Sequence, residues 1–150
     1  MRDRIYEALK AAIKGRQPRR MATLRLISAA IKDRDIDARG EGREAVSDDE
    51  ILSLMQKMVR QREESATVFA DAGRPELAAQ ELEEIGIIQE FLPQPLSAEE
   101  VGAAIAEAIA ATGAEGLRDM GKVVGALKTK FPGRIDLGKA SKTIKTRLHG

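Results

Sequence analysis

The sequence predicts an all-α protein, and three observations support this fold class. Apolar residues recur at three- and four-residue steps along nearly the whole chain, which is the period of an amphipathic helix. The composition is dominated by Ala, Leu, Glu, Lys and Arg, which favour helices, and only 3% of the residues are aromatic. No segment alternates strictly enough between polar and apolar residues to predict a strand.

The first two predicted helices cover residues 2–14 and 18–37, with Gly15 between them. Pro18 suits the first turn of a helix, where its missing N–H is not needed. A polar loop that contains glycine is expected over 38–46. The residues expected to face the core from this pair are Ile5, Leu9, Ala12, Ile13, Met21, Leu24, Ile27 and Ile31.

The third and fourth predicted helices, 47–72 and 75–91, form an antiparallel hairpin because little more than Gly73 separates them. Ser47 and Glu50 form a capping box, in which each side chain accepts a hydrogen bond from the backbone N–H of the other residue. The inward residues are expected to be Ile51, Leu54, Met55, Met58, Val59, Phe69, Leu82, Ile85, Ile88 and Leu92.

Pro93 and Pro95 stop the fourth helix and predict a boundary between two domains. Residues 1–93 are expected to form a four-helix domain that contains the long hairpin. Residues 97–150 are expected to form a three-helix tail domain.

The first helix of the tail domain is predicted to begin at a second capping box, headed by Ser97, and to end near residue 112. Asp119 and Asp136 are expected to cap the other two helices, which a turn at 132–133 separates. The inward residues are expected to be Val101, Ala104, Ile105, Ala108, Ile109, Met120, Val123, Val124, Leu127, Phe131, Ile144 and Leu148.

Several kinds of chemistry are excluded by composition. There is no cysteine, so disulfides, thiolate metal sites and cysteine catalysis are excluded. The single histidine, His149, stands next to the C-terminus, so a histidine-based triad and a multi-histidine metal site are excluded too. The glycine-containing loop lacks the G-K-[ST] ending of a phosphate-binding loop. We expect no catalytic residue, no metal and no cofactor.

The polar residues of the first domain have structural interpretations. Its glutamates are expected to form a solvated face with Glu–Arg pairs, because carboxylate metal sites in helical bundles add a histidine. Asp33, Asp35 and Asp37 alternate along a helix, which scatters their side chains, and we expect them to solvate its end. Ser28 is expected to pack or to bond locally. The glutamates of the hairpin are Glu63, Glu64, Glu81, Glu83, Glu84 and Glu90.

No apolar stretch approaches the ~18–20 residues that cross a membrane, and the N-terminus lacks the apolar core of a secretory signal. We therefore expect a cytoplasmic protein with no membrane partner.

Charge is divided unevenly along the chain. The total of +1 hides a net charge of −10 over residues 41–100 and of +6 from residue 114 to the end. Clustered lysines can neutralise several phosphates, and few aromatic side chains stand near them to stack on single-stranded bases. The tail therefore predicts contacts to a structured RNA, without sequence readout of DNA. A merely solubilising lysine-rich helix is the alternative.

The candidate nucleic-acid-binding residues lie in the last two predicted helices and the turn between them. Lys139, Lys142 and Lys145 step by three residues and are neighbours along one helix edge. Gly121 and Gly125 each cost about 1 kcal/mol relative to Ala in a helix interior. Close helix packing, which we favour, or close approach of a ligand would offset that cost. The other candidates are Lys122, Lys128, Lys130, Arg134 and Arg147.

Four stretches resemble the YqeY family: LRLISAAIKDRDID (24–37), QREESATVFADAGRPELA (61–78), EIGIIQEFLPQPLS (84–97) and DMGKVVGALK (119–128). Members of this family are similar to the C-terminal helical and tail regions of GatB, a subunit of the bacterial tRNA-dependent amidotransferase. The resemblance covers nearly the whole chain. It implies a helical domain followed by a three-helix tail domain.

The resemblance also implies a function. In the amidotransferase the corresponding region helps to hold tRNA, while amide transfer from glutamine occurs elsewhere. The motif Asp119–Lys122 and the lysines after it therefore become a candidate tRNA-facing surface. A carbon–nitrogen ligase activity would be that of the relative, and we expect none from this chain alone.

Three functional hypotheses follow. The first is a non-catalytic module that docks tRNA or another structured RNA through its basic tail. The second is an accessory of a tRNA-dependent amidotransferase within a larger complex, with a tRNA-synthesis or amidotransferase protein as partner. The third is a protein-interaction scaffold that uses the acidic hairpin around 81–90.

Overall fold

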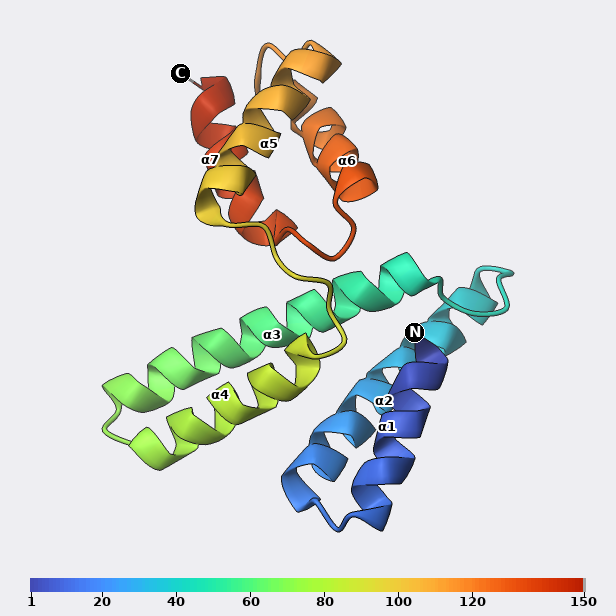
Figure 1. Ribbon diagram of the computed structural model, residues 1–150. Helices are drawn as coiled ribbons and strands as arrows, with labels where there is room; N and C mark the ends of the chain where they lie inside the picture. The colour runs from blue at the N-terminus through green and yellow to red at the C-terminus, as the bar shows by residue number, and fades with distance from the viewer. Residues whose placement is uncertain (150) are drawn as a thin grey trace. The chain divides into compact units, whose positions relative to one another are not determined.

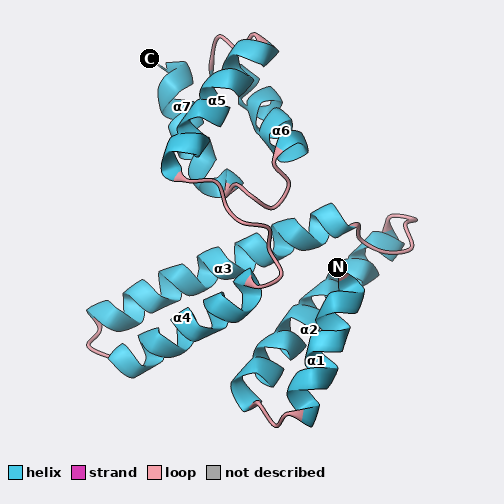
Figure 2. Cartoon of the chain, viewed as in Figure 1, coloured by secondary structure: helices cyan, strands magenta, loops and turns pink. Residues whose placement is uncertain are grey.

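The computed structural model describes residues 1–149, which fold into seven α-helices and one short 3₁₀ helix without any strand (Figures 1 and 2). The predicted all-α class is confirmed. The helices are α1 (Arg2–Lys14), α2 (Pro18–Gly40), α3 (Asp48–Asp71), α4 (Pro75–Gln89), α5 (Ala98–Thr112), η1 (Leu117–Asp119), α6 (Met120–Lys130) and α7 (Leu137–His149).

The chain divides after Leu92 into two compact units. The first unit, Met1–Leu92, holds α1 to α4, and the tail unit begins at Pro93 and holds α5 to α7. The predicted domains 1–93 and 97–150 stay a prediction. None of the described helices is long and apolar enough to cross a membrane.

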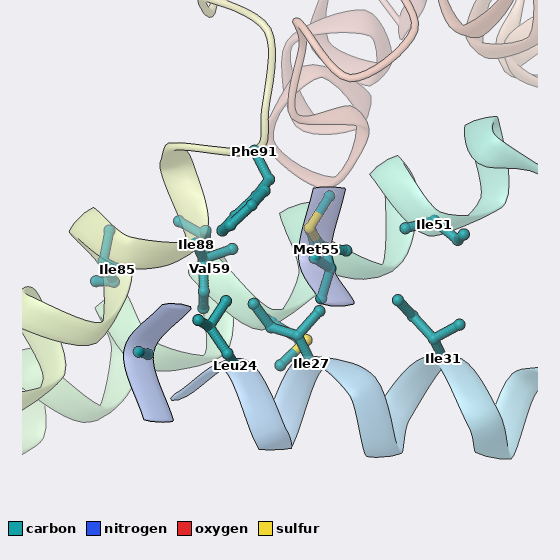
Figure 3. Close-up of a cluster of buried hydrophobic side chains, with 12 residues drawn as sticks. Leu24, Ile27, Ile31, Ile51, Met55, Val59, Ile85, Ile88 and Phe91 are labelled. Atoms are coloured by element: carbon teal, nitrogen blue, oxygen red, sulfur yellow. The ribbon is translucent and has the colours of Figure 1, made fainter. Parts of the chain in front are cut away.

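The core of the first unit lies where α2 meets the hairpin of α3 and α4. Figure 3 shows side chains of α2 pointing toward those of α3 and α4. Their burial keeps this apolar surface away from water, which is the main stabilising contribution to such a core. The side chains that the figure labels are Leu24, Ile27, Ile31, Ile51, Met55, Val59, Ile85, Ile88 and Phe91.

Two helix ends differ from the sequence prediction. α2 continues to Gly40 instead of ending at 37, because Ala38 is buried and the turn that contains it packs against the unit. α4 ends at Gln89 instead of 91, because the Phe91 amide donates to the Ile88 carbonyl three residues back, which tightens the chain out of the α-helix.

Two residues predicted to face the core are exposed. Ile13 in α1 is 47% exposed and Leu82 in α4 is 59% exposed. Phe69 is half-buried. A stripe of residues at three- and four-residue steps is wider than the strip that one neighbouring helix covers, so the residues on its margin stay in water. Of the remaining predicted core residues, each is buried or partly buried against a core.

The predicted helix caps hold with one exception. In both capping boxes the serine Oγ accepts from the glutamate backbone N–H, at 3.2 Å for Ser47 and 3.1 Å for Ser97. Asp136 accepts from the amides of the first turn of α7, at 2.9 Å from Gly138. Asp119 does not cap α6. Its carboxylate instead accepts from the amide of Glu115 at 3.0 Å, so it closes the preceding turn.

Asp35 does not solvate a helix end as predicted. It is 7% exposed, and its carboxylate accepts hydrogen bonds from both terminal guanidinium nitrogens of Arg2 at 2.6 Å. The amide of Val46 donates to the same carboxylate at 3.0 Å, and Arg2 donates to the Val46 carbonyl at 3.0 Å. We call this arrangement the Asp35 clasp. It ties α1, the end of α2 and the loop before α3 together. Asp33 and Asp37 remain exposed, as predicted.

The acidic hairpin pairs with arginines, as the sequence predicted. Glu84 accepts from Arg62 at 3.1 Å within the hairpin, and Glu83 lies 3.4 Å from Arg19 of α2. Arg20 of α2 pairs with Glu90. No group of three acidic or histidine side chains that could hold a metal ion occurs in residues 1–149.

Thr23 offers a test of packing in the first unit. Its side chain is fully buried, and its hydroxyl has no hydrogen-bond partner among the described residues. Thr23→Val keeps the shape and removes the unsatisfied hydroxyl, so we expect the free energy of unfolding to rise by about 1 kcal/mol. Urea unfolding followed by circular dichroism measures it. Thr67→Val, at an exposed site whose hydroxyl donates to the Glu63 carbonyl, is the control and should bring no gain. A loss of stability in Thr23→Val would contradict the prediction.

Candidate nucleic-acid interface

The tail unit is built on an apolar core that its three α-helices share. In α6 the fully buried positions are Val123 and Leu127, and in α7 they are Ala140 and Ile144, each pair four residues apart. Residues four apart lie on one face of a helix, so the opposite faces of α6 and α7 are left to the polar residues. Met120, named in the sequence motif, packs partly buried against this core.

The two arginines among the candidate residues are held by carbonyl groups of the tail unit. Arg134 donates through Nε to the Gln94 carbonyl at 3.0 Å, and its own carbonyl accepts from the amide of Leu96. Arg147 donates from α7 to the carbonyl of Gly102 in α5 at 3.1 Å. Arg134 and Arg147 thereby hold the segment 94–96 and α5 in place, so their first role is structural.

Two of the candidate lysines stand beside acidic residues. Lys130 lies 2.8 Å from Glu107 of α5 and 5.6 Å from the centre of the Phe131 ring. Lys122 lies 3.6 Å from Asp119. The hydrogen bond from the Glu115 amide is the main cause that holds the pKa of Asp119 below its ordinary value, so this carboxylate stays charged. Both lysines are mostly exposed, and such surface pairs are weak enough to exchange for a phosphate.

Three candidate lysines are exposed and make no ion pair or hydrogen bond through their ammonium groups within residues 1–149. They are Lys128 of α6 and Lys142 and Lys145 of α7. Lys139 is exposed as well, and its backbone amide donates to Asp136 at the start of α7. Because α6 and α7 pack against each other, these ammonium groups belong to one small unit.

Gly121 and Gly125 do not pack closely against another helix, so the favoured sequence interpretation is wrong. Both are exposed, and a Cβ built on either would meet nothing within 4 Å. The hydroxyl of Thr129, one turn further, donates to the Gly125 carbonyl at 2.9 Å. The face of α6 that carries the glycines therefore presents bare backbone and a hydroxyl, a feature that helical spacing alone did not reveal.

The arrangement can attract a polyanion. Unpaired ammonium groups supply charge, and an uncovered helix backbone lets a bulky ligand come near. Half-buried Phe131 is the one aromatic residue of the described tail, which leaves no platform for stacking a series of bases.

Fold and site together define an all-helical protein with a basic three-helix tail unit. A family model described as Yqey-like protein matches residues 2–148. The chain therefore belongs to the YqeY family, as its four motifs predicted. None of the curated proteins matches this chain.

Proposed function

We propose that this protein is a non-catalytic module that docks tRNA or another structured RNA through the exposed faces of α6 and α7. The observation that carries the proposal is the set of unpaired, exposed ammonium groups of Lys128, Lys142 and Lys145. Each can neutralise one phosphate without first breaking a pair in the protein.

The form of the ligand follows from what surrounds these lysines. Phosphate contacts position a nucleic acid but do not read its sequence. Few aromatic side chains are present, so a folded RNA that offers its backbone fits better than a single strand that offers its bases. The similarity of this family to the tRNA-holding part of GatB supports tRNA as the RNA.

The test replaces the three lysines with Gln and measures binding of total tRNA as a function of salt. We expect affinity to fall about tenfold at 50 mM salt, and the slope of log K against log[salt] to become shallower by about one per lost phosphate contact. Gln preserves helix formation, so circular dichroism should not change.

A matched control carries the same change of net charge in the first unit. Lys14, Lys32 and Lys57 are exposed there, and their replacement with Gln should leave tRNA affinity near that of the unchanged protein. An equal loss of tRNA affinity in the two triple variants would show that binding depends on net charge and not on the tail. Absence of tRNA binding at low salt would refute the proposed function.

A further inference from the structure

A second surface lies in the first unit, at the edge of the core. A groove of about 340 Å³ runs between α2 and α3. Its apolar lining is Leu26, Ala29 and Ala30 from α2 and Leu54 and Met58 from α3. The groove is distinct from the tail unit and its lysines, and the inference drawn from it does not rest on the proposed RNA function.

The exposed apolar part of this lining is Leu26 and Ala29, since Met58 belongs to the buried core and Ala30 and Leu54 pack against it. The core positions of α2 include Leu24, Ile27 and Ile31, all buried. Leu26, by contrast, is 50% exposed, and Ala29 is exposed as well. A helix that packs one face against its own unit ordinarily leaves polar residues on the rest of its surface, so exposed apolar residues that line a groove indicate an interaction surface.

The dimensions of the groove suit a helix. Leu54, Met58 and Gln61 on α3 follow the spacing i, i+4, i+7, and Leu26, Ala30 and Asp33 line the α2 side over the same length. That length is about two helical turns, or roughly 10–12 Å. Alanines along the α2 wall leave room for the backbone of a third helix to approach, as in the helix-in-groove mode of recognition.

The charges at the rim define the partner further. Arg34 on α2 and Lys57 on α3 are exposed and have no ion-pair or hydrogen-bond partner among the described residues. Arg62 is already neutralised by Glu84 at 3.1 Å and also donates to the Met58 carbonyl, which fixes this part of the wall. Among the lining residues Asp33 alone is acidic, so unpaired positive charge exceeds negative charge by one.

We propose that this groove binds an amphipathic helix of a partner protein that carries carboxylates on either side of its apolar face. The apolar face would cover Leu26 and Ala29. Carboxylates on opposite flanks of that helix would meet Arg34 and Lys57, whose charge discriminates against a basic helix.

The experiment uses two synthetic helical peptides with the same leucines at i, i+4 and i+7. One has Glu and the other Lys at the flanking positions, and each carries a fluorescent label. Anisotropy is measured with the full chain. We expect the Glu peptide to bind at least tenfold more tightly than the Lys peptide. The double variant Arg34→Glu/Lys57→Glu should reverse that preference.

The apolar contribution is tested with Leu26→Glu, which should abolish binding of the Glu peptide. Leu82→Glu is the matched control, because Leu82 is an exposed leucine of the same unit outside the groove, and it should bind as the unchanged protein does. Both sites are exposed, so circular dichroism should report folded variants.

Three results would overturn the proposal. The first is equal or absent binding of the two peptides. The second is an equal loss in Leu26→Glu and Leu82→Glu. The third is a dimer, seen by sedimentation, that Leu26→Glu dissociates, because a second copy of the chain would then occupy the groove.

Discussion

Asp35→Asn is expected to lower the free energy of unfolding by about 2 kcal/mol at pH 7. The substitution keeps the shape of the side chain but removes the charged carboxylate, which accepts hydrogen bonds from both terminal guanidinium nitrogens of Arg2. Hydrogen bonds to charged groups contribute about 1.5–3 kcal/mol, and the amide of Asn leaves one nitrogen of Arg2 facing another donor. Urea unfolding of the variant and the unchanged protein measures the difference.

The effect of Asp35 should depend on pH. The hydrogen bonds from Arg2, and then from the Val46 amide, lower the pKa of Asp35 from its ordinary 3.8 to about 2 in the folded protein. A carboxylate with a depressed pKa stabilises the folded state fully above its unfolded pKa, and this contribution disappears as pH falls through the folded pKa. The difference between the two proteins should therefore be constant above about pH 5 and shrink between about pH 4 and 2.

Asp33→Asn is the control for this experiment, because Asp33 is on the same helix and exposed. We expect it to change stability by less than about 0.5 kcal/mol. A difference for Asp35→Asn that stays the same from pH 7 to pH 2 would show that the carboxylate charge is not what the clasp uses.

The double variant Gly121→Ala/Gly125→Ala is expected to raise the stability of the tail while weakening tRNA binding. Neither glycine has a positive φ, and a Cβ at either meets nothing within 4 Å, so the folded tail accepts both methyl groups. Gly125 lies inside α6 and should add about 1 kcal/mol, with less from Gly121 in the first turn. If a phosphate backbone approaches this face of α6, the same methyl groups should weaken tRNA binding about tenfold.

Gly86→Ala is the matched control for the glycines. Gly86 lies inside α4 of the first unit, and a Cβ there also meets nothing within 4 Å. It should raise the thermal midpoint by a similar amount and leave tRNA affinity unchanged. A more stable tail variant with unchanged affinity would show that no ligand approaches the glycines.

Local features of the fold were readable in the sequence because neighbours along the chain determine them. Ser47 and Glu50 are three residues apart, so a capping box depends on little else than their order. Gly73 and Gly133 both have a positive φ, which favours glycine, and the sequence predicted a break between helices at both places. Asp119 was misread for a related reason, since its carboxylate had amides available on both sides and bonds the earlier ones.

Features that join distant parts of the chain were not readable. Asp35 is 33 residues from Arg2, and Arg147 is 45 residues from Gly102. Nothing in the spacing of these residues points to their partners. The exposure of Leu82 and Leu26 was unpredictable for the same reason. Periodicity shows that a helix has an apolar side, but not which residues of that side a neighbouring helix leaves uncovered.

The sequence by itself determined the helices, most of their caps, the family and the separation of charge between the acidic hairpin and the basic tail. The helices and caps depend on residue type and on spacings of a few residues, which act within one or two helical turns. The charge separation and the family depend on residue identity along the chain and need no contact between distant segments. The tertiary structure alone decided which charged side chains have a partner within the protein. Asp35 pairs with Arg2, and Arg134 and Arg147 donate hydrogen bonds to carbonyl groups. Lys128, Lys142 and Lys145 remain unpaired within the described residues. It also uncovered the glycine face of α6 and the groove beside α2, because burial is a property of the whole packed unit and not of any one segment.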